Sequence, residues 1–579
     1  MLPHTDSKSI ARLIQAARGD RPADLRLCNG RLVNVYLGSV EQKDIVVADG
    51  MIVGFGDGPA RESVDLKGCF VAPGFIDSHV HLESAMLAPS EFARTVLPCG
   101  TTAVVADPHE IANVLGTAGI DYMLQATEDL PLGVWFSLPS CVPASSLETA
   151  GAVLEAGDMV PYLRHPRVVA LAEMMDFHGL IHEDAKVLAK IEAARMAGKR
   201  LDGHAPGLTG RMLHAYLVSG IGSDHECTTM TEAREKMAAG MVIMVRQGSA
   251  ARNQDALIPL ADASTSRRMM WCSDDCHPHD LLSRGHIDHL VRRAIGGGMD
   301  PITAIQMATL NPAEYFRLDH LGAIAPGKRA DLVIFDDLNH PVIRQVYAAG
   351  RRVADRGAIR PGMVEKASLS APAAMKVPLD ALDFKVPAQG SVLRVIEVVR
   401  DQIVTRAAVM DAAVAEGMAV SDVGRDLLKI VVVERHRFTG QTGIGFIRGF
   451  GLKQGALASS VAHDAHNIVA VGVSDEDIRR AVETVVKLGG GLAAVAQGRV
   501  QAALPLPIAG LMSDQPAAVV VHRLDELLAA ARRMGSSLPD PFMALSFLAL
   551  PVVPALKITD HGLVDVAAAK VVHLFCENH

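Results

Sequence analysis

Between residues 71 and 320 the sequence repeats one pattern: a short apolar segment followed, in most cases, by a stretch with helical periodicity. Apolar runs of this length are typical of strands that are buried on both faces of a parallel sheet. The segments are Gly74 to His81, Thr101 to Asp107, Gly133 to Pro139, Val168 to Met175, Arg200 to His204, Gly222 to His225, Met241 to Val245 and Met270 to Asp274. Eight βα units within about 250 residues match the length of a (β/α)8 barrel of the TIM type.

Short alternating segments flank the predicted barrel on both sides. Before it, apolar and polar residues alternate around Asn29-Gly30 and Asp49-Gly50, which are typical signals of β-hairpins. A similar alternation returns after it, at Gly327 to Asp336. We therefore predict a small β-sandwich domain, built from residues 1–70 (with an N-terminal helix) and 321–365, into which the barrel is inserted.

The last 200 residues form a third region, 380–579, which we predict to be an α+β domain. It contains strand-like segments and a helix from Asp475 to Leu488, with Ser474 as its N-cap and glycines after its end. His463 and His466 are three residues apart; they could share a helix face, reach a neighbouring site from a loop, or serve only local packing. The chain as a whole is thus predicted to be an α/β protein with an added C-terminal α+β domain.

Composition argues against two classes of partner. The chain has 56 Lys and Arg against 65 Asp and Glu, a net charge of −9, which gives no electrostatic basis for binding nucleic acid. The sequence lacks an uncharged apolar run of about 18 residues, so we expect no membrane span. It also lacks an export signal, and none of its eight cysteines has C-x-x-C spacing, so we expect a cytoplasmic protein with reduced thiols.

The strongest chemical signal is His79-Val80-His81 at the end of the first predicted strand. Residues i and i+2 of a strand point to the same side, so both histidines can hold one metal ion. Other strand ends add His204, His225 and Asp274. Because barrel active sites lie at the C-terminal ends of the strands, this set predicts a metal-dependent barrel that binds a borderline divalent ion such as zinc, iron or manganese.

This arrangement resembles the amidohydrolase superfamily, which places H-x-H on strand one, histidines on strands five and six, and an aspartate on strand eight. The resemblance covers about residues 20–360. Many members with two metal ions bridge them by a carboxylated lysine on strand four. Here that strand carries Glu173 instead of a lysine, and a glutamate can bridge two ions directly.

Longer motifs narrow the resemblance to the bacterial adenine deaminases. In the barrel they are His79 to Ser84, Val105 to Gly116, Ala172 to Met175, Asp202 to Gly207 and Ser223 to Glu226, and in the third region Gly445 to Lys453 and Val461 to Ile468. The resemblance implies hydrolysis of adenine to hypoxanthine and ammonia, with a small purine base as substrate. It also implies two divalent metal ions per chain (Mn²⁺ or Fe²⁺, with Zn²⁺ as the alternative) and a homo-oligomer, dimer or higher.

The resemblance also implies roles for individual residues. The metal ligands would be His79, His81, Glu173, His204, His225 and Asp274. Asp274 would also accept the proton of the attacking water, and Asp275 would contact the purine. The residue that protonates the purine ring stays open. The candidates are Glu83, Glu226 and the pair Asp107 and His109, each of which could instead hydrogen-bond a metal ligand.

Two other functions use the same fold. A cyclic amide hydrolase of the dihydroorotase or hydantoinase kind shares the barrel and H-x-H, but the missing lysine on strand four speaks against it. A non-catalytic scaffold would be expected to have lost ligands, and all the expected positions are filled. A cytidine-deaminase type of zinc site is set aside, because Pro98-Cys99 is not followed by the second cysteine of P-C-x-x-C.

Overall fold

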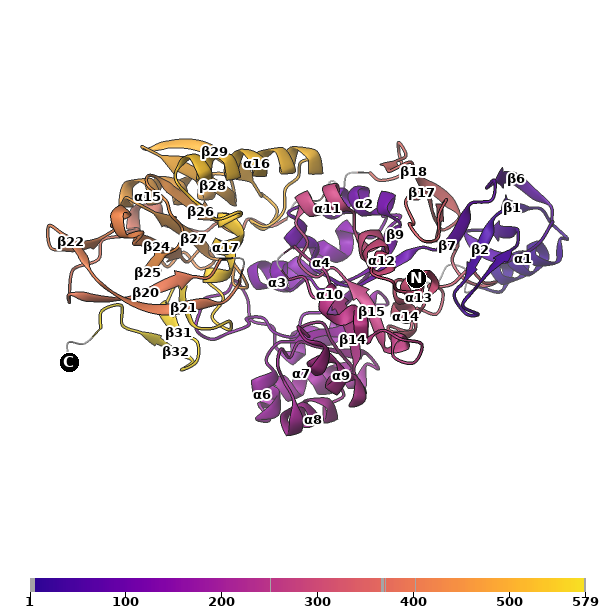
Figure 1. The fold of residues 1–579 in the computed structure, drawn as a ribbon, viewed down its shortest axis with the longest axis horizontal. Helices are drawn as coiled ribbons and strands as arrows, with labels where there is room; N and C mark the ends of the chain where they lie inside the picture. Colours follow the sequence, from indigo (N-terminus) through magenta and orange to yellow (C-terminus); the bar gives the residue numbers. More distant parts are fainter. Residues whose placement is uncertain (1–5, 250, 366–368, 370, 401, 577–579) are drawn as a thin grey trace.

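The computed structural model describes residues 6–249, 251–365, 369, 371–400 and 402–576. Three bodies lie in a row (Figure 1): the C-terminal region in orange and yellow, the barrel in purple and magenta, and a small β unit at the far end. Among the described residues, no helix combines the length and apolarity needed to cross a lipid bilayer.

Eight parallel strands form the central barrel. They are β8 (Phe75–Val80), β9 (Thr101–Ala106), β10 (Gly133–Leu138), β11 (Val168–Met174), β12 (Arg200–Gly203), β13 (Ser223–Asp224), β14 (Val242–Arg246) and β15 (Met269–Cys272). β8 to β12 form one sheet and β13 to β15 a second. Backbone bonds join the two sheets at both edges: Gly222 donates to Leu201 at 2.9 Å, and Asp274 donates to His79 at 2.9 Å. The predicted (β/α)8 barrel is confirmed.

Helices follow the strands around the outside of the barrel. They are α2 (Pro89–Val96), α3 (His109–Leu115), α4 (Thr117–Ala126), α5 (Ala156–Leu163), α6 (Phe177–Ile181), α7 (Ala185–Met196), α8 (Gly210–Val218), α9 (Met230–Ala238), α10 (Gln254–Leu257), α11 (Pro278–Arg284), α12 (Ile287–Gly296), α13 (Pro301–Met307) and α14 (Leu310–Tyr315). A 3₁₀ turn, Leu82–Ala85, follows β8. Gly74 lets β8 approach β9, because a Cβ there would lie 2.1 Å from Thr102 Oγ1.

The chain on either side of the barrel builds one β-sandwich. One sheet has the order β5-β4-β1-β6 and the other β19-β18-β17-β16-β7-β2-β3. Their bounds are β1 (Ala23–Cys28), β2 (Arg31–Asn34), β3 (Ser39–Gln42), β4 (Ile45–Ala48), β5 (Met51–Phe55), β6 (Ala60–Asp65), β7 (Phe70–Pro73), β16 (Leu332–Phe335), β17 (Ile343–Ala348), β18 (Arg351–Asp355) and β19 (Ala358–Ile359). β16 pairs with β7, so segments from before and after the barrel share a sheet. Leu25, Val47 and Leu332 belong to the apolar core between the sheets, and α1 (Ser7–Arg18) precedes them.

The C-terminal region is built on a mixed sheet of order β21-β20-β25-β24-β27-β26-β28-β29. Its strands are β20 (Val392–Val398), β21 (Thr405–Asp411), β24 (Leu428–Val433), β25 (Thr442–Arg448), β26 (Ala456–Ser459), β27 (Ile468–Gly472), β28 (Gly491–Ala496) and β29 (Arg499–Pro505). The helices are α15 (Asp475–Lys487), α16 (Ala517–Arg533) and α17 (Pro541–Leu548). Smaller sheets add β22 (Ala413–Ala415), β23 (Met418–Val420), β30 (Leu556–Thr559), β31 (Gly562–Asp565) and β32 (Lys570–Val572). The side chain of Ser474 accepts from Asp477 N, as expected for the predicted N-cap of α15.

The C-terminal region lies against the mouth of the barrel, where the strands end. The segment after β8 pairs with it, since Ala88 N donates to Ser513 O at 3.0 Å and Ser513 N donates to Met86 O at 2.8 Å. The segment after β10 also contacts it, because Thr149 N donates to the Asp560 carboxylate at 2.9 Å. This packing places C-terminal side chains next to the barrel site.

Candidate metal centre

The ends of five barrel strands bring the six predicted metal ligands into one cluster. β8 supplies His79 and, one residue past its end, His81. Glu173 lies on β11, and the other three side chains directly follow or lie near the ends of β12, β13 and β15: His204, His225 and Asp274. All are buried except His204, which is partly exposed.

The Glu173 carboxylate lies between two pairs of histidines. Its Oε1 is 3.7 Å from His79 Nε2 and 3.4 Å from His81 Nε2. Its Oε2 is 2.6 Å from His204 Nδ1 and 3.2 Å from His225 Nε2. Each oxygen of one carboxylate therefore faces its own histidine pair.

Asp274 completes the set on the side of His79 and His81. Its Oδ1 lies 3.6 Å from His79 Nε2 and 3.1 Å from His81 Nε2. Burial acts to raise the pKa of Asp274, but the Arg246 guanidinium and the two histidines outweigh burial and hold this pKa well below its usual range. The pKa of Glu173 is likewise low, because His204 and His225 outweigh its burial. Both side chains are therefore carboxylates.

Two observations show that these residues fit a divalent metal ion. Among the described residues, none forms a hydrogen bond with the buried His79 Nε2, and an orphaned polar atom of this kind is costly unless something else binds it. His81 Nδ1 lies 3.0 Å from the Asp107 carbonyl oxygen, so Nδ1 carries the hydrogen and Nε2 presents its lone pair. Imidazole and carboxylate donors are those that zinc, iron and manganese prefer.

Arg246, at the end of β14, is a site residue that sequence reasoning missed. Its Nη1 lies 2.5 Å from Asp274 Oδ2 and also contacts Glu226 Oε1. Asp274 thus turns one oxygen to the histidines while Arg246 holds the other. The signal was available: the seventh predicted strand stopped at Val245, and inspection of the next position would have found the arginine.

Lys236, on α9, is a second residue that sequence reasoning missed. It bonds the chain directly next to two of the histidines. Its Nζ donates to Ala205 O at 2.6 Å and also bonds the Asp224 carboxylate. Ala205 directly follows His204, and Asp224 directly precedes His225. A buried ammonium group therefore ties the ends of β12 and β13 together.

The candidate proton donors differ in their surroundings. Glu83 is buried; its Oε1 accepts from Ile111 N at 3.1 Å, and its Oε2 has no hydrogen-bond partner among the described residues. Burial raises the pKa of Glu83 to about 7. Glu226 is instead ion-paired to Arg246. Glu83 thus keeps a buried oxygen without a hydrogen bond, whereas Glu226 is held by Arg246 through its Oε1.

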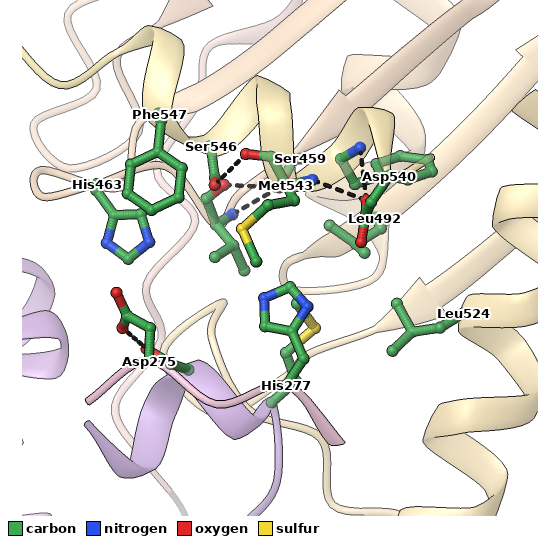
Figure 2. Close-up of a pocket in the computed structure, with 14 residues that line it drawn as sticks. Asp275, His277, Ser459, His463, Leu492, Leu524, Asp540, Met543, Ser546 and Phe547 are labelled. Atoms are coloured by element: carbon green, nitrogen blue, oxygen red, sulfur yellow. Dashed lines mark hydrogen bonds between the residues drawn. The ribbon is translucent and has the colours of Figure 1, made fainter. Parts of the chain in front are cut away.

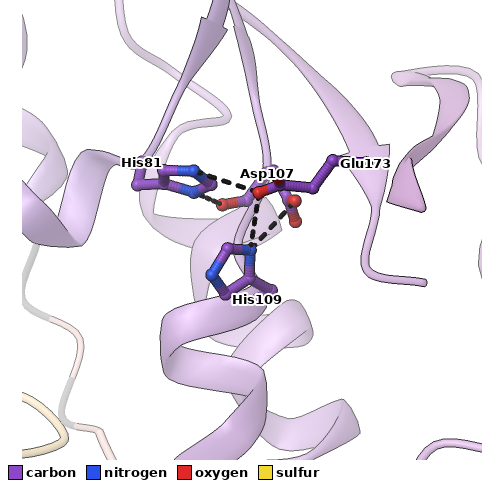
Figure 3. Close-up of side chains that lie close together, drawn as sticks. All are labelled: His81, Asp107, His109 and Glu173. Carbon is purple, nitrogen blue, oxygen red and sulfur yellow. Dashed lines mark hydrogen bonds and ion pairs between the residues drawn. The ribbon is translucent and has the colours of Figure 1, made fainter. Parts of the chain in front are cut away.

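Asp107 and His109 lie beside Glu173 (Figure 3). His109 Nδ1 is 3.0 Å from Asp107 Oδ2 and 3.5 Å from Glu173 Oε1. The other ring nitrogen of His109 faces away from both carboxylates (Figure 3). His109 therefore contacts the carboxylates of the centre through Nδ1, and its Nε2 points away from them.

A pocket next to the centre is shared between the barrel and the C-terminal region (Figure 2). From the barrel, Asp275 lines it, and Ser84 Oγ donates to Asp275 Oδ1 at 2.5 Å. From the C-terminal region, the rings of His463 and Phe547 stack with their centroids 4.7 Å apart and form part of its wall. Asp275, the predicted purine contact, thus faces an aromatic wall from the other part of the chain.

Comparisons with known proteins identify the family to which the chain belongs. The model of the amidohydrolase family matches residues 70–366, and the model of the adenine deaminase C-terminal domain matches residues 402–570. An adenine deaminase of Desulfatibacillum aliphaticivorans is 52% identical over 97% of this chain and 99% of its own. One of Methanothrix thermoacetophila is 48% identical over 98% of this chain and 100% of its own. A crystal structure of an adenine deaminase has a TM-score of 0.44 at 17% identity, over 58% of this chain and 100% of that one.

The chain belongs to the amidohydrolase family, the class that the barrel and its strand-end histidines define, and within it to the adenine deaminases. The relatives match it almost from end to end, so the C-terminal region is part of the family's architecture and not an unrelated addition.

Proposed function

We propose that the chain hydrolyses adenine to hypoxanthine and ammonia at a centre of two divalent metal ions, one on each side of Glu173. The observation that carries this proposal is the placement of the two Glu173 oxygens, one toward His79 and His81 and the other toward His204 and His225. Mn²⁺ or Fe²⁺ is the proposed metal, with Zn²⁺ as the alternative, because the donors are nitrogen and oxygen only.

Divalent ions held by these residues would lower the pKa of a coordinated water to ~7 and would so supply hydroxide at neutral pH. As the hydroxide oxygen adds to C6, Asp274 would accept its remaining proton through Oδ1 and then pass it to the amino group, which leaves as ammonia. Asp274 is suited to this role because Arg246 fixes its other oxygen and keeps it ionised before the reaction. Glu83 is the proposed donor to the purine ring, because its Oε2 is free while Glu226 is held by Arg246.

The purine base is proposed to bind in the pocket between Asp275 and the ring pair His463 and Phe547. A planar aromatic ligand can pack against this ring pair, and one carboxylate provides orientation through the ring nitrogens. The Ser84 hydroxyl fixes the rotamer of Asp275 by its hydrogen bond. We further propose that the protein works as a homo-oligomer, as its resemblance to the adenine deaminases implies, and that it works in the cytoplasm.

The reaction class can be tested by product analysis in oxygen-18-labelled water. The metal-loaded protein is expected to convert adenine to hypoxanthine that carries the label at C6, and to release one ammonia for each hypoxanthine. Dihydroorotate and hydantoin, assayed in parallel, are expected to stay intact. Turnover of a cyclic amide without turnover of adenine would instead support the dihydroorotase or hydantoinase alternative.

A further inference from the structure

A second cluster of metal-binding side chains lies on the far side of His109 from the centre. We call it the interface cluster: His109 and Glu110 from the start of α3, and His463 and Asp464 from the segment between β26 and β27. All four side chains are buried. Two belong to the barrel and two to the C-terminal region, so the cluster joins the two parts of the chain.

The hydrogen bond between His109 and Asp107 determines which nitrogen of His109 can bind a metal. Asp107 Oδ2 accepts from His109 Nδ1 at 3.0 Å, so the hydrogen lies on Nδ1 and Nε2 keeps a free lone pair. That Nε2 is 3.5 Å from Glu110 Oε1. A carboxylate that holds the rear nitrogen of an imidazole is the usual support of a metal-bound histidine.

Glu110 is oriented in a similar way. His466 Nδ1 accepts from Ala462 N at 3.1 Å, so its hydrogen lies on Nε2, which donates to Glu110 Oε2. The other oxygen, Oε1, faces into the cluster and lies 2.8 Å from His463 Nδ1. One carboxylate oxygen is therefore fixed, and the second is available as a ligand.

Asp464 supplies the fourth donor. Its Oδ1 is 3.9 Å from His463 Nδ1, and its Oδ2 has no hydrogen-bond partner among the described residues although the residue is only 4% exposed. The donor atoms of His109, Glu110 and Asp464 lie within 4.8 Å of one another. Ligands about 2.0–2.1 Å from a tetrahedral zinc ion are ~3.3 Å apart. The distances from His463 Nδ1 to Glu110 Oε1 (2.8 Å) and to Asp464 Oδ1 (3.9 Å) lie on either side of that value.

Two further buried carboxyl groups lie near the cluster, and the Arg435 guanidinium approaches it from the C-terminal region by donating to His466 O. Glu148 Oε1 and Asp560 Oδ2 are buried and have no hydrogen-bond partner among the described residues. Burial raises the pKa of Glu148 well above its usual range, and the charges of Asp464 and Asp560 raise it further. Buried carboxylates at this density are costly without a nearby cation.

We propose that the interface cluster is a separate binding site for a divalent transition-metal ion, with His109 Nε2, Glu110 Oε1, His463 Nδ1 and the Asp464 carboxylate as its ligands. The ion would fasten α3 of the barrel to the C-terminal region. It would also hold His109 in its contact with Asp107, next to Glu173. The proposal does not depend on the reaction at Glu173, because none of its four ligands is a ligand of the first centre, although His463 also lines the pocket proposed for the purine base.

Metal counting tests the proposal. The protein is stripped with a chelator, reloaded with Zn²⁺, dialysed and analysed for zinc. We expect three ions per chain for the wild type and two for Asp464→Asn. Asp477→Asn is the matched control, because Asp477 is a buried aspartate of the same region that only accepts backbone bonds from Gln497 and Gly498, so it should keep three.

A crystal of the zinc-loaded wild type gives a second measurement that needs no variant. An anomalous difference peak is expected about 2 Å from His109 Nε2. Two ions per chain in both wild type and Asp464→Asn, with peaks only beside Glu173, would overturn the proposal and leave a proton shared by Glu110 and His463. A peak at His109 without peaks at Glu173 would uphold it while the proposed reaction centre failed.

Discussion

The replacement Lys236→Met tests how the ends of β12 and β13 are held. Lys236 is 0% exposed, and its ammonium group bonds Asp224, Glu232 and the Ala205 carbonyl. The variant leaves two buried carboxylates without their cation, which costs about 3–5 kcal/mol. At about 2–4 °C per kcal/mol for a domain of the size of this barrel, the apparent Tm should fall by ~6–20 °C.

The assay is thermal unfolding of the metal-free protein, followed by zinc titration of the folded variant. Because His204 and His225 lose their support, metal affinity should fall by about 10–100-fold. Lys186→Met, at an exposed lysine paired with Glu155, is the control and should leave the free energy of unfolding and the apparent Tm essentially unchanged, because solvent screens an exposed pair.

A double variant distinguishes the free-energy cost of an unpaired charge from the cost of lost packing. Lys236→Met combined with Asp224→Asn removes a charge of each sign, so it should be more stable than Lys236→Met alone. The reasoning is refuted if Lys236→Met unfolds at the wild-type temperature. It is also refuted if Asp224→Asn lowers the Tm of Lys236→Met by as much as it lowers the Tm of the wild type.

Three further variants test the centre itself. Glu173→Gln should lower the metal content by at least one ion per chain and abolish most activity, and full turnover with unchanged metal content would exclude the bridging role. Glu83→Gln should reduce kcat by about 10²–10⁴-fold with the metal content unchanged, and a normal kcat would move the proton donor elsewhere. Arg246→Met removes the guanidinium charge, which is the largest of the contributions that lower the pKa of Asp274, so this pKa rises. The active, ionised form is then lost at higher pH, and the acid limb of kcat/KM should move to higher pH; an unmoved limb would contradict this role for Arg246.

The barrel and five of the six clustered side chains could be predicted because their signals are local, whereas Glu173 was assigned only by the resemblance to the amidohydrolases. Apolar runs marked the strands, and the fold rule that sites lie at strand ends then selected residues such as His79 and His204 from the histidines of the chain. The two-residue period of a strand placed His79 and His81 on one side. None of these steps required knowledge of long-range contacts.

Lys236 could not be recognised in the same way, and for Arg246 the position at a strand end could be read from the sequence but its partner could not. A lysine on a helix is usually a solvated residue, and Lys236 is buried only because the ends of β12 and β13 close over it. The pairing of Arg246 with Asp274 depends on the barrel register, which no local pattern encodes.

The histidines of the C-terminal region show the same limit. The spacing of His463 and His466 left a helix face, a reach to a neighbouring site and local packing open. The structure places both on a segment between two strands, where they contact Glu110 of the barrel. Only the packing of the two parts of the chain against each other distinguishes these cases.

The central claim is that metal ions held around Glu173 drive the deamination of adenine. The most direct measurement is adenine turnover, followed by ultraviolet absorbance and by ammonia release, in protein stripped with a chelator and then reloaded with Mn²⁺. We predict no conversion by the stripped protein and conversion to hypoxanthine, with one ammonia per adenine, after reloading. Conversion that persists after metal removal, or adenine left unchanged by the fully loaded protein, would contradict the account.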